Sequence, residues 1–143
     1  MVDLIIVEGS TFSLVLRWEV SPYIYKPITA ITKAGPAVIT ATSHGLPDGW
    51  RVAVVNVGGM RQIKAKYWPP RSTDFHKATV VNSNSISLND VDSTNYTTYT
   101  SGGSLLYLTP ASLSGVTARM QIRSTAESTT ILDSLVSPTD IVL

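Results

Sequence analysis

The chain has no cysteine among its 143 residues, which excludes a disulfide framework, a thiol nucleophile, a thiolate zinc site and an iron–sulfur cluster. Charged side chains are also scarce, because Lys, Arg, Asp and Glu make up 15 % of the residues and the formal net charge is +1. That balance creates no general attraction for nucleic acid or for anionic lipid. We therefore expect neither a nucleic acid nor a membrane as partner, and no cofactor.

Long hydrophobic runs are missing as well. The longest apolar-rich stretch, from Val52 to Met60, is interrupted by Asn56, Gly58 and Gly59, whereas a transmembrane helix needs about 20 apolar residues. The first ten residues contain no basic segment and only a short apolar run, so we expect no signal peptide.

The residues that are abundant favour strands. Val, Ile and Thr together supply 43 of the 143 residues, and β-branched side chains pack best on a pleated surface. Residues 11–18 alternate with period two, as a half-buried strand does, and their apolar face consists of Phe12, Leu14, Leu16 and Trp18. No segment of ten or more residues has the spacing of an amphipathic helix. The sequence predicts an all-β protein.

The alternating segments fall into two modules. Between Pro27 and Pro110 short strands are expected at 28–33, 37–42, 50–57, 60–67, 75–81, 85–88 and 104–108. Short strands with turn signals every 8–12 residues or so are typical of a small barrel or sandwich. Alternation resumes at 117–123 and 130–136, whereas the two prolines of 21–27 exclude a central strand there. We predict a partial β-sandwich formed by residues 1–26 and 111–143, interrupted by an inserted small β-barrel at 27–110.

Few groups could support catalysis. His44 and His76 are the only histidines. We expect His44 to bond a turn carbonyl and His76 to lie on a strand face. Asp90 and Asp92 are expected on one face of a strand, where they could act as the acid–base pair of a glycan hydrolase or hold Ca²⁺. The spacing of an EF-hand loop is absent, so a solvated turn is the preferred interpretation, and we predict no enzyme activity and no metal site.

Basic and aromatic residues interleave at one place, which contains Arg61, Lys64, Lys66, Tyr67, Trp68 and Arg71. Arg, Tyr and Trp are the residues of interface hot spots, and we name Arg61, Tyr67 and Trp68 as candidate interface residues. A solvated loop and a single-strand nucleic-acid site are the alternatives. A separate receptor- or glycan-binding hypothesis uses four aromatic residues as a stacking platform, namely Trp50, Trp68, Tyr96 and Tyr99.

The flanking segments resemble the N-terminal β-sandwich of bacteriophage baseplate upper proteins, a domain of tail and baseplate proteins. In that family a strand of the type G-x-x-F-x-L-x-L-R-W is followed by D-L-x-G-x-x-A-R-M-Q-I-R. The first pattern is matched by Gly9, Phe12, Leu14, Leu16, Arg17 and Trp18. The second is matched by Leu113, Gly115 and 118–123, with Ser112 where the family usually has Asp.

The insert is similar to the first catalytic cysteine half-domain of ubiquitin-activating enzymes, a small β-barrel that recurs in phage virion proteins. The similarity rests on 39–46, Gly59-Met60, Tyr96, Tyr99 and 101–103. The chain has no cysteine, which removes the thioester chemistry of those enzymes. Together the two resemblances cover nearly the whole chain.

The resemblances imply a virion structural protein of the tail, baseplate or fibre-attachment region, made in the cytoplasm of the bacterial host. Members of the flank family continue with further strands, so neighbouring subunits are expected to complete the sheet. The implied partners are other virion proteins and copies of the chain itself, and a host surface receptor is an alternative partner. The expected apolar interface consists of Phe12, Leu14, Leu16, Trp18, Met120 and Ile122. A capsid decoration or head-fibre protein is the other alternative.

Overall fold

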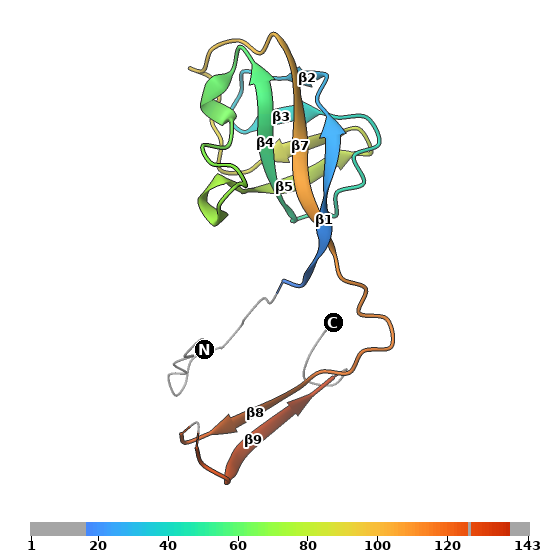
Figure 1. Cartoon of the computed structure of the whole chain (residues 1–143), viewed down its shortest axis with the longest axis vertical. Coiled ribbons are helices and arrows are strands. Elements are labelled where there is room, and N and C mark those ends of the chain that lie inside the picture. The colour runs from blue at the N-terminus through green and yellow to red at the C-terminus, as the bar shows by residue number, and fades with distance from the viewer. Residues whose placement is uncertain (1–16, 126, 138–143) are drawn as a thin grey trace. The chain divides into compact units, whose positions relative to one another are not determined.

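A computed structural model describes residues 17–125 and 127–137. The chain divides into two compact units, Met1–Pro110 and Ala111–Leu143. In the described residues the elements are β1 Glu19–Pro27, β2 Ala30–Ile31, β3 Ala37–Thr40, β4 Arg51–Gly58, the 3₁₀ turns η1 Arg61–Ile63 and η2 Ser72–Asp74, β5 His76–Asn82, β6 Ser85–Leu88, β7 Ser101–Pro110, β8 Arg119–Arg123 and β9 Ile131–Val136 (Figure 1). The prediction of an all-β protein is confirmed. None of the helical segments in these residues is long and apolar enough to cross a membrane.

The first unit contains one antiparallel sheet of seven strands, ordered β1-β7-β4-β5-β6-β3-β2. Among the described residues no ladder joins β1 to β2, so hydrogen bonds do not close the sheet into a barrel. The predicted hairpin of 75–81 and 85–88 is present as β5 and β6, whose turn lies at 83–84.

β1 pairs with β7, and this pairing places residues 19–26 in the seven-stranded sheet. The sequence pattern predicts instead that these residues belong to the flanking module. The prolines fit because β1 is an edge strand, where a missing N–H need not break a ladder. The register shifts between Val20 and Tyr23, so the Ser21-Pro22 pair is accommodated as an irregularity in the strand.

The prediction of a strand at 60–67 is wrong. Met60 and Ile63 are both buried, and a spacing of three residues suits one 3₁₀ turn rather than an alternating strand. The chain forms η1 here, and the following segment returns to β4 through a 2.8 Å hydrogen bond from the Ala65 N–H to the Val54 carbonyl.

β4 is apolar on both faces, which explains its nearly continuous apolar sequence. Val52, Val54 and Val57 belong to the main core, whereas Ala53 and Val55 join Leu106 in a smaller cluster. The side chains packed against that smaller cluster include Ala65 and Phe75, from the loop between β4 and β5. We call the side of β4 that carries Ala53 and Val55 its outer face.

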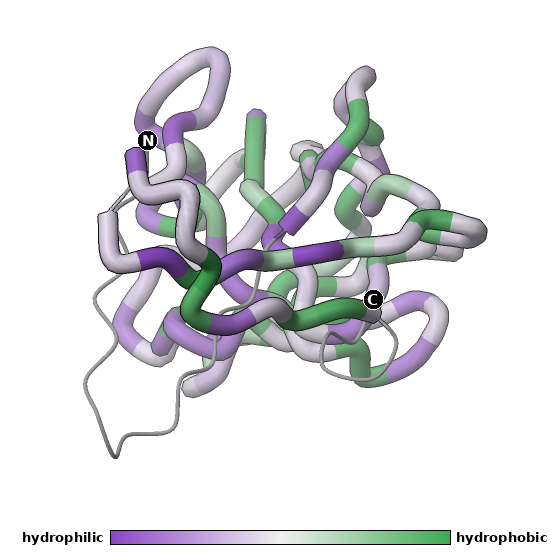
Figure 2. The backbone as a smooth tube through the Cα atoms, turned by 90° about the horizontal axis from the view of Figure 1, so that it is seen from below, coloured by the Kyte–Doolittle hydropathy of each residue, from purple (hydrophilic) through white to green (hydrophobic). Residues whose placement is uncertain are grey.

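The second unit has two strands in the described residues, the hairpin of β8 and β9. The register places Met120 opposite Leu135 and Ile122 opposite Asp133. Because side chains alternate along a strand, these four residues share one face, while Gln121 lies on the other. The hydropathy colours of Figure 2 alternate along β8, whereas in β9 the apolar residues come in two pairs, Ile131-Leu132 and Leu135-Val136, on either side of Asp133-Ser134.

Candidate functional site: a basic and aromatic pocket beside β4

An open pocket of about 350 Å³ lies on the outer face of β4. Its lining comes from the end of β4 and from the loop after η1, and consists of Val55, Asn56, Lys64, Ala65, Lys66, Tyr67 and Trp68. Figure 1 shows this loop, with its two 3₁₀ turns, beside β4. The structure therefore brings part of the predicted basic and aromatic cluster together around one cavity.

Asn56 and Val55 both reach the pocket because the backbone of β4 is unusual at this point. Asn56 has a φ of 57°, in the left-handed region that asparagine tolerates better than most residues. The alternation of β4 changes here, since Val55 faces outward and Val57 belongs to the main core. Two consecutive residues can thus line the same pocket.

Asp74 holds the pocket loop in place. This buried carboxylate accepts hydrogen bonds from the backbone N–H groups of Lys66 and Arg71, at 2.9 Å each. The Lys66 N–H is the largest cause of a lowered Asp74 pKa. The N–H groups of Arg71 and Tyr67 and the Lys66 charge lower it further, while desolvation opposes them. The loop therefore depends on an ionised Asp74.

We expect the pocket loop to loosen in acid. A carboxyl whose pKa is lower in the folded than in the unfolded state, where it is about 3.9, stabilises the fold above that pH. This contribution is lost as the pH falls through the folded pKa, so below about pH 4 the protection of the Lys66 and Arg71 amides, relative to the intrinsic exchange rate at each pH, should fall. Hydrogen exchange followed by NMR measures the effect.

Asp74→Asn should weaken protection of these amides at neutral pH and remove the acid-dependent step. Asp92→Asn is the matched control, because hydrogen bonds from the Thr94 hydroxyl and N–H lower the Asp92 pKa in a different loop. An acid step that survives in Asp74→Asn would contradict this role.

The lysines of the pocket loop make no direct ion pair in the described part of the chain. The ion pairs found there involve Arg17, Arg51 and His76, so neither Lys64 nor Lys66 has a carboxylate at ion-pair distance. The nearby Asp74 carboxylate interacts with the Lys66 charge through space. Both lysines are exposed, so the pocket presents two exposed ammonium groups.

The two aromatic residues of the pocket have different surroundings. The Arg71 guanidinium lies 3.8 Å from the centroid of the Tyr67 ring and covers one of its faces. Trp68 is 68 % exposed. Arg61, the third predicted interface residue of this cluster, lies in η1 and is exposed, but it does not line the pocket.

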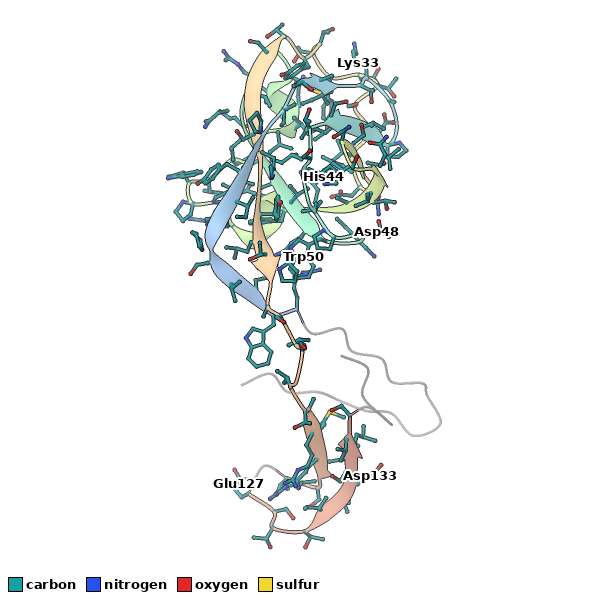
Figure 3. All side chains as sticks on the ribbon, turned by 90° about the vertical axis from the view of Figure 1, so that its right-hand side faces the viewer. Lys33, His44, Asp48, Trp50, Glu127 and Asp133 are labelled. Atoms are coloured by element: carbon teal, nitrogen blue, oxygen red, sulfur yellow. The ribbon has the colours of Figure 1, made fainter. Side chains whose placement is uncertain are left out.

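His44 has a structural role. It is buried, and its Nδ1 accepts a 3.0 Å hydrogen bond from the Leu46 N–H. Nε2 therefore carries the proton and donates to the Asn82 carbonyl at 2.8 Å. Figure 3 shows His44 inside the sheet unit. The expected bond to a backbone carbonyl is present, although the carbonyl belongs to the last residue of β5 rather than to a turn, and both ring nitrogens are engaged.

Asp90 and Asp92 do not form the strand-face pair expected from the sequence. Both lie in the loop after β6, because the strand ends at Leu88. Asp90 pairs with His76 at 2.9 Å, whereas Asp92 accepts hydrogen bonds from Thr94. Within the described residues no three His, Asp or Glu side chains gather as a possible metal site.

The four-residue aromatic platform does not form a single surface. Trp50, Tyr96 and Tyr99 pack against the main core, and the Trp50 indole N–H donates to the Leu108 carbonyl at 2.7 Å. Trp68 instead lines the pocket. These four residues share an aromatic side chain, but they pack in different places.

The predicted flank interface is described only in part. Phe12, Leu14 and Leu16 lie outside the described residues. Trp18 is 70 % exposed, and Met120 and Ile122 are half-buried on one face of the β8–β9 hairpin.

No family model matches this chain, and no curated protein matches it significantly.

Proposed function

We propose that the chain is a structural subunit of a phage virion, in the tail, baseplate or fibre-attachment region, and that it acts by assembly rather than by catalysis. The observation that carries the proposal is the β8–β9 hairpin. It is a two-stranded sheet in the described residues, and it presents Leu132 at 65 % and Ile131 at 44 % exposure. An isolated two-stranded hairpin is marginally stable at best in water and needs further strands or a packed face.

One face of this hairpin supplies a surface for such packing. Met120, Ile122 and Leu135 lie together on it, beside Asp133, while Leu132 lies on the opposite face. Strand addition at an open edge is a common way for subunits to associate. A neighbouring copy of the chain that covers this face would bury the three side chains and complete the sheet.

The assignment to a virion rests on the two flanking sequence motifs. The last residues of the second motif form β8. The involvement of both His44 nitrogens in backbone contacts supports a structural rather than a catalytic role for that residue.

Virions purified from the lysate in which this chain is produced provide the test. We expect mass spectrometry to detect the chain in intact particles, and antibodies against it to label the tail or baseplate in electron micrographs. Label on the capsid would favour a decoration or head-fibre protein instead. A chain that is abundant in the lysate and absent from washed particles would contradict the proposal.

A further inference from the structure

We propose that the pocket beside β4 binds a carboxylate-bearing pyranose, such as a uronic acid unit of an acidic polysaccharide. Trp68 would stack on the sugar ring and Lys64 and Lys66 would pair with the carboxylate. The site lies on the sheet unit, and its argument does not depend on the β8–β9 hairpin or on assembly.

The first requirement is a flat apolar surface that is free to stack. Trp68 is 68 % exposed at the mouth of the pocket, and an indole offers a broad apolar face with one polar edge. Arg71 covers one face of Tyr67, which is 45 % exposed, so Trp68 is the more accessible aromatic residue of the pocket for the C–H face of a sugar.

The second requirement is positive charge in the right place. Lys64 and Lys66 both line the pocket and have no ion-pair partner in the described residues. Two ammonium groups beside an apolar plane select an anion with an apolar face.

The third requirement is a neutral group that can bond hydroxyls. The Asn56 side chain offers both a donor and an acceptor, and Asn56 is exposed at the pocket. Its φ of 57° is uncommon within a strand. Such backbone conformations concentrate at binding sites, where they aim a side chain that regular structure would direct elsewhere.

The pocket is also organised before any ligand arrives. The Ala65 N–H bonds the Val54 carbonyl, and Asp74 fixes the N–H groups of Lys66 and Arg71. A loop that is already ordered loses less conformational entropy when it binds.

A sugar fits this site better than a single-stranded nucleic acid. Nucleic-acid grooves combine a positive track with several aromatic side chains on which successive bases stack. Here one indole is free to stack, and the net charge of the chain is +1.

Titration of the ¹⁵N-labelled full chain with tri-galacturonate, followed by NMR, tests the proposal. Maltotriose serves as the neutral control and a thymidine oligonucleotide as the nucleic-acid control. We expect saturable shifts centred on 55–56 and 64–68 with tri-galacturonate, no comparable shifts with maltotriose, and weaker binding in high salt because the lysine contacts are screened.

Trp68→Ala should weaken the affinity at least tenfold, and Lys64→Gln and Lys66→Gln about fivefold each. Trp18→Ala is the matched control, since Trp18 is 70 % exposed and lies outside the pocket. Lys33→Gln controls for the loss of charge, because Lys33 is exposed and does not line the pocket. Figure 3 shows Lys33 at the end of the sheet unit away from Trp50.

The proposal is overturned if no saturable shift occurs up to about 20 mM sugar, well above a millimolar dissociation constant. It is also overturned if Trp18→Ala weakens binding as much as Trp68→Ala does. Tighter binding of the oligonucleotide would identify a nucleic-acid site instead. Folding of each variant is confirmed from its NMR spectrum.

Discussion

Replacing Gly59 with alanine is expected to unfold the sheet unit or come close to doing so. Gly59 has a φ of +79°, and a Cβ built there would lie 2.1 Å from the Thr98 carbonyl oxygen and 2.8 Å from the Thr100 nitrogen. Both neighbours are backbone atoms and cannot rotate away. The left-handed conformation alone costs an L-residue about 1–2 kcal/mol. With the forced backbone shift we expect a total of about 4 kcal/mol, from a typical stability of about 5–15 kcal/mol.

Gly45→Ala separates the two causes. Gly45 also has a positive φ, +64°, but a Cβ added there would meet the Tyr107 hydroxyl oxygen at 3.8 Å, an ordinary contact. This variant should lose only about 1–2 kcal/mol. Urea denaturation of both variants measures the difference. Equal losses of unfolding free energy for the two variants would contradict the close approach of residues 98–100 to Gly59.

Met120→Glu is expected to dissociate the assembled protein. Met120 lies opposite Leu135 on the face of the β8–β9 hairpin that also carries Ile122 and Asp133. If a second copy covers that face, as proposed, a carboxylate at 120 adds a second buried negative charge beside Asp133 with no cation to pair with it. Breaking or creating such an unpaired buried charge costs about 3–5 kcal/mol, which corresponds to a weakening of association by two to three orders of magnitude or more. Size-exclusion chromatography with light scattering at several concentrations measures the shift.

Gln121→Glu is the matched control for this variant. It places the same residue one position along the same strand, on the opposite face. It also puts the new carboxylate beside Arg123, whose guanidinium now donates to the Gln121 side chain at 2.8 Å. Association should be nearly unchanged. If both variants dissociate the protein equally, the Met120 face is not the contact.

Local patterns predicted much of the fold. The turn residues 82–84 between two alternating segments predicted the β5–β6 hairpin, and 117–123 and 130–136 contain β8 and β9. The segment 60–67 failed because burial of Met60 and Ile63 follows a 3₁₀ spacing, which short apolar runs do not distinguish from a strand. β1 was missed since two prolines obscured an edge strand that only its pairing with β7 defines.

The candidate site was predictable only where its residues are neighbours in sequence. Lys64, Lys66, Tyr67 and Trp68 form a local cluster that composition alone detects. Val55 and Asn56 were missed, because they reach the pocket through the return of the loop to β4 and through a left-handed backbone. The Asp74 bonds to this loop carry no sequence signal beyond an acid eight residues after Lys66.

Sedimentation equilibrium of the purified full chain tests most directly whether it works as an assembly subunit. We predict a mass of two or more times that of the 15.4 kDa chain, with hydrogen-exchange protection of the β8–β9 amides that rises with protein concentration. A folded 15.4 kDa species at every concentration, with the hairpin equally protected throughout, would contradict the account.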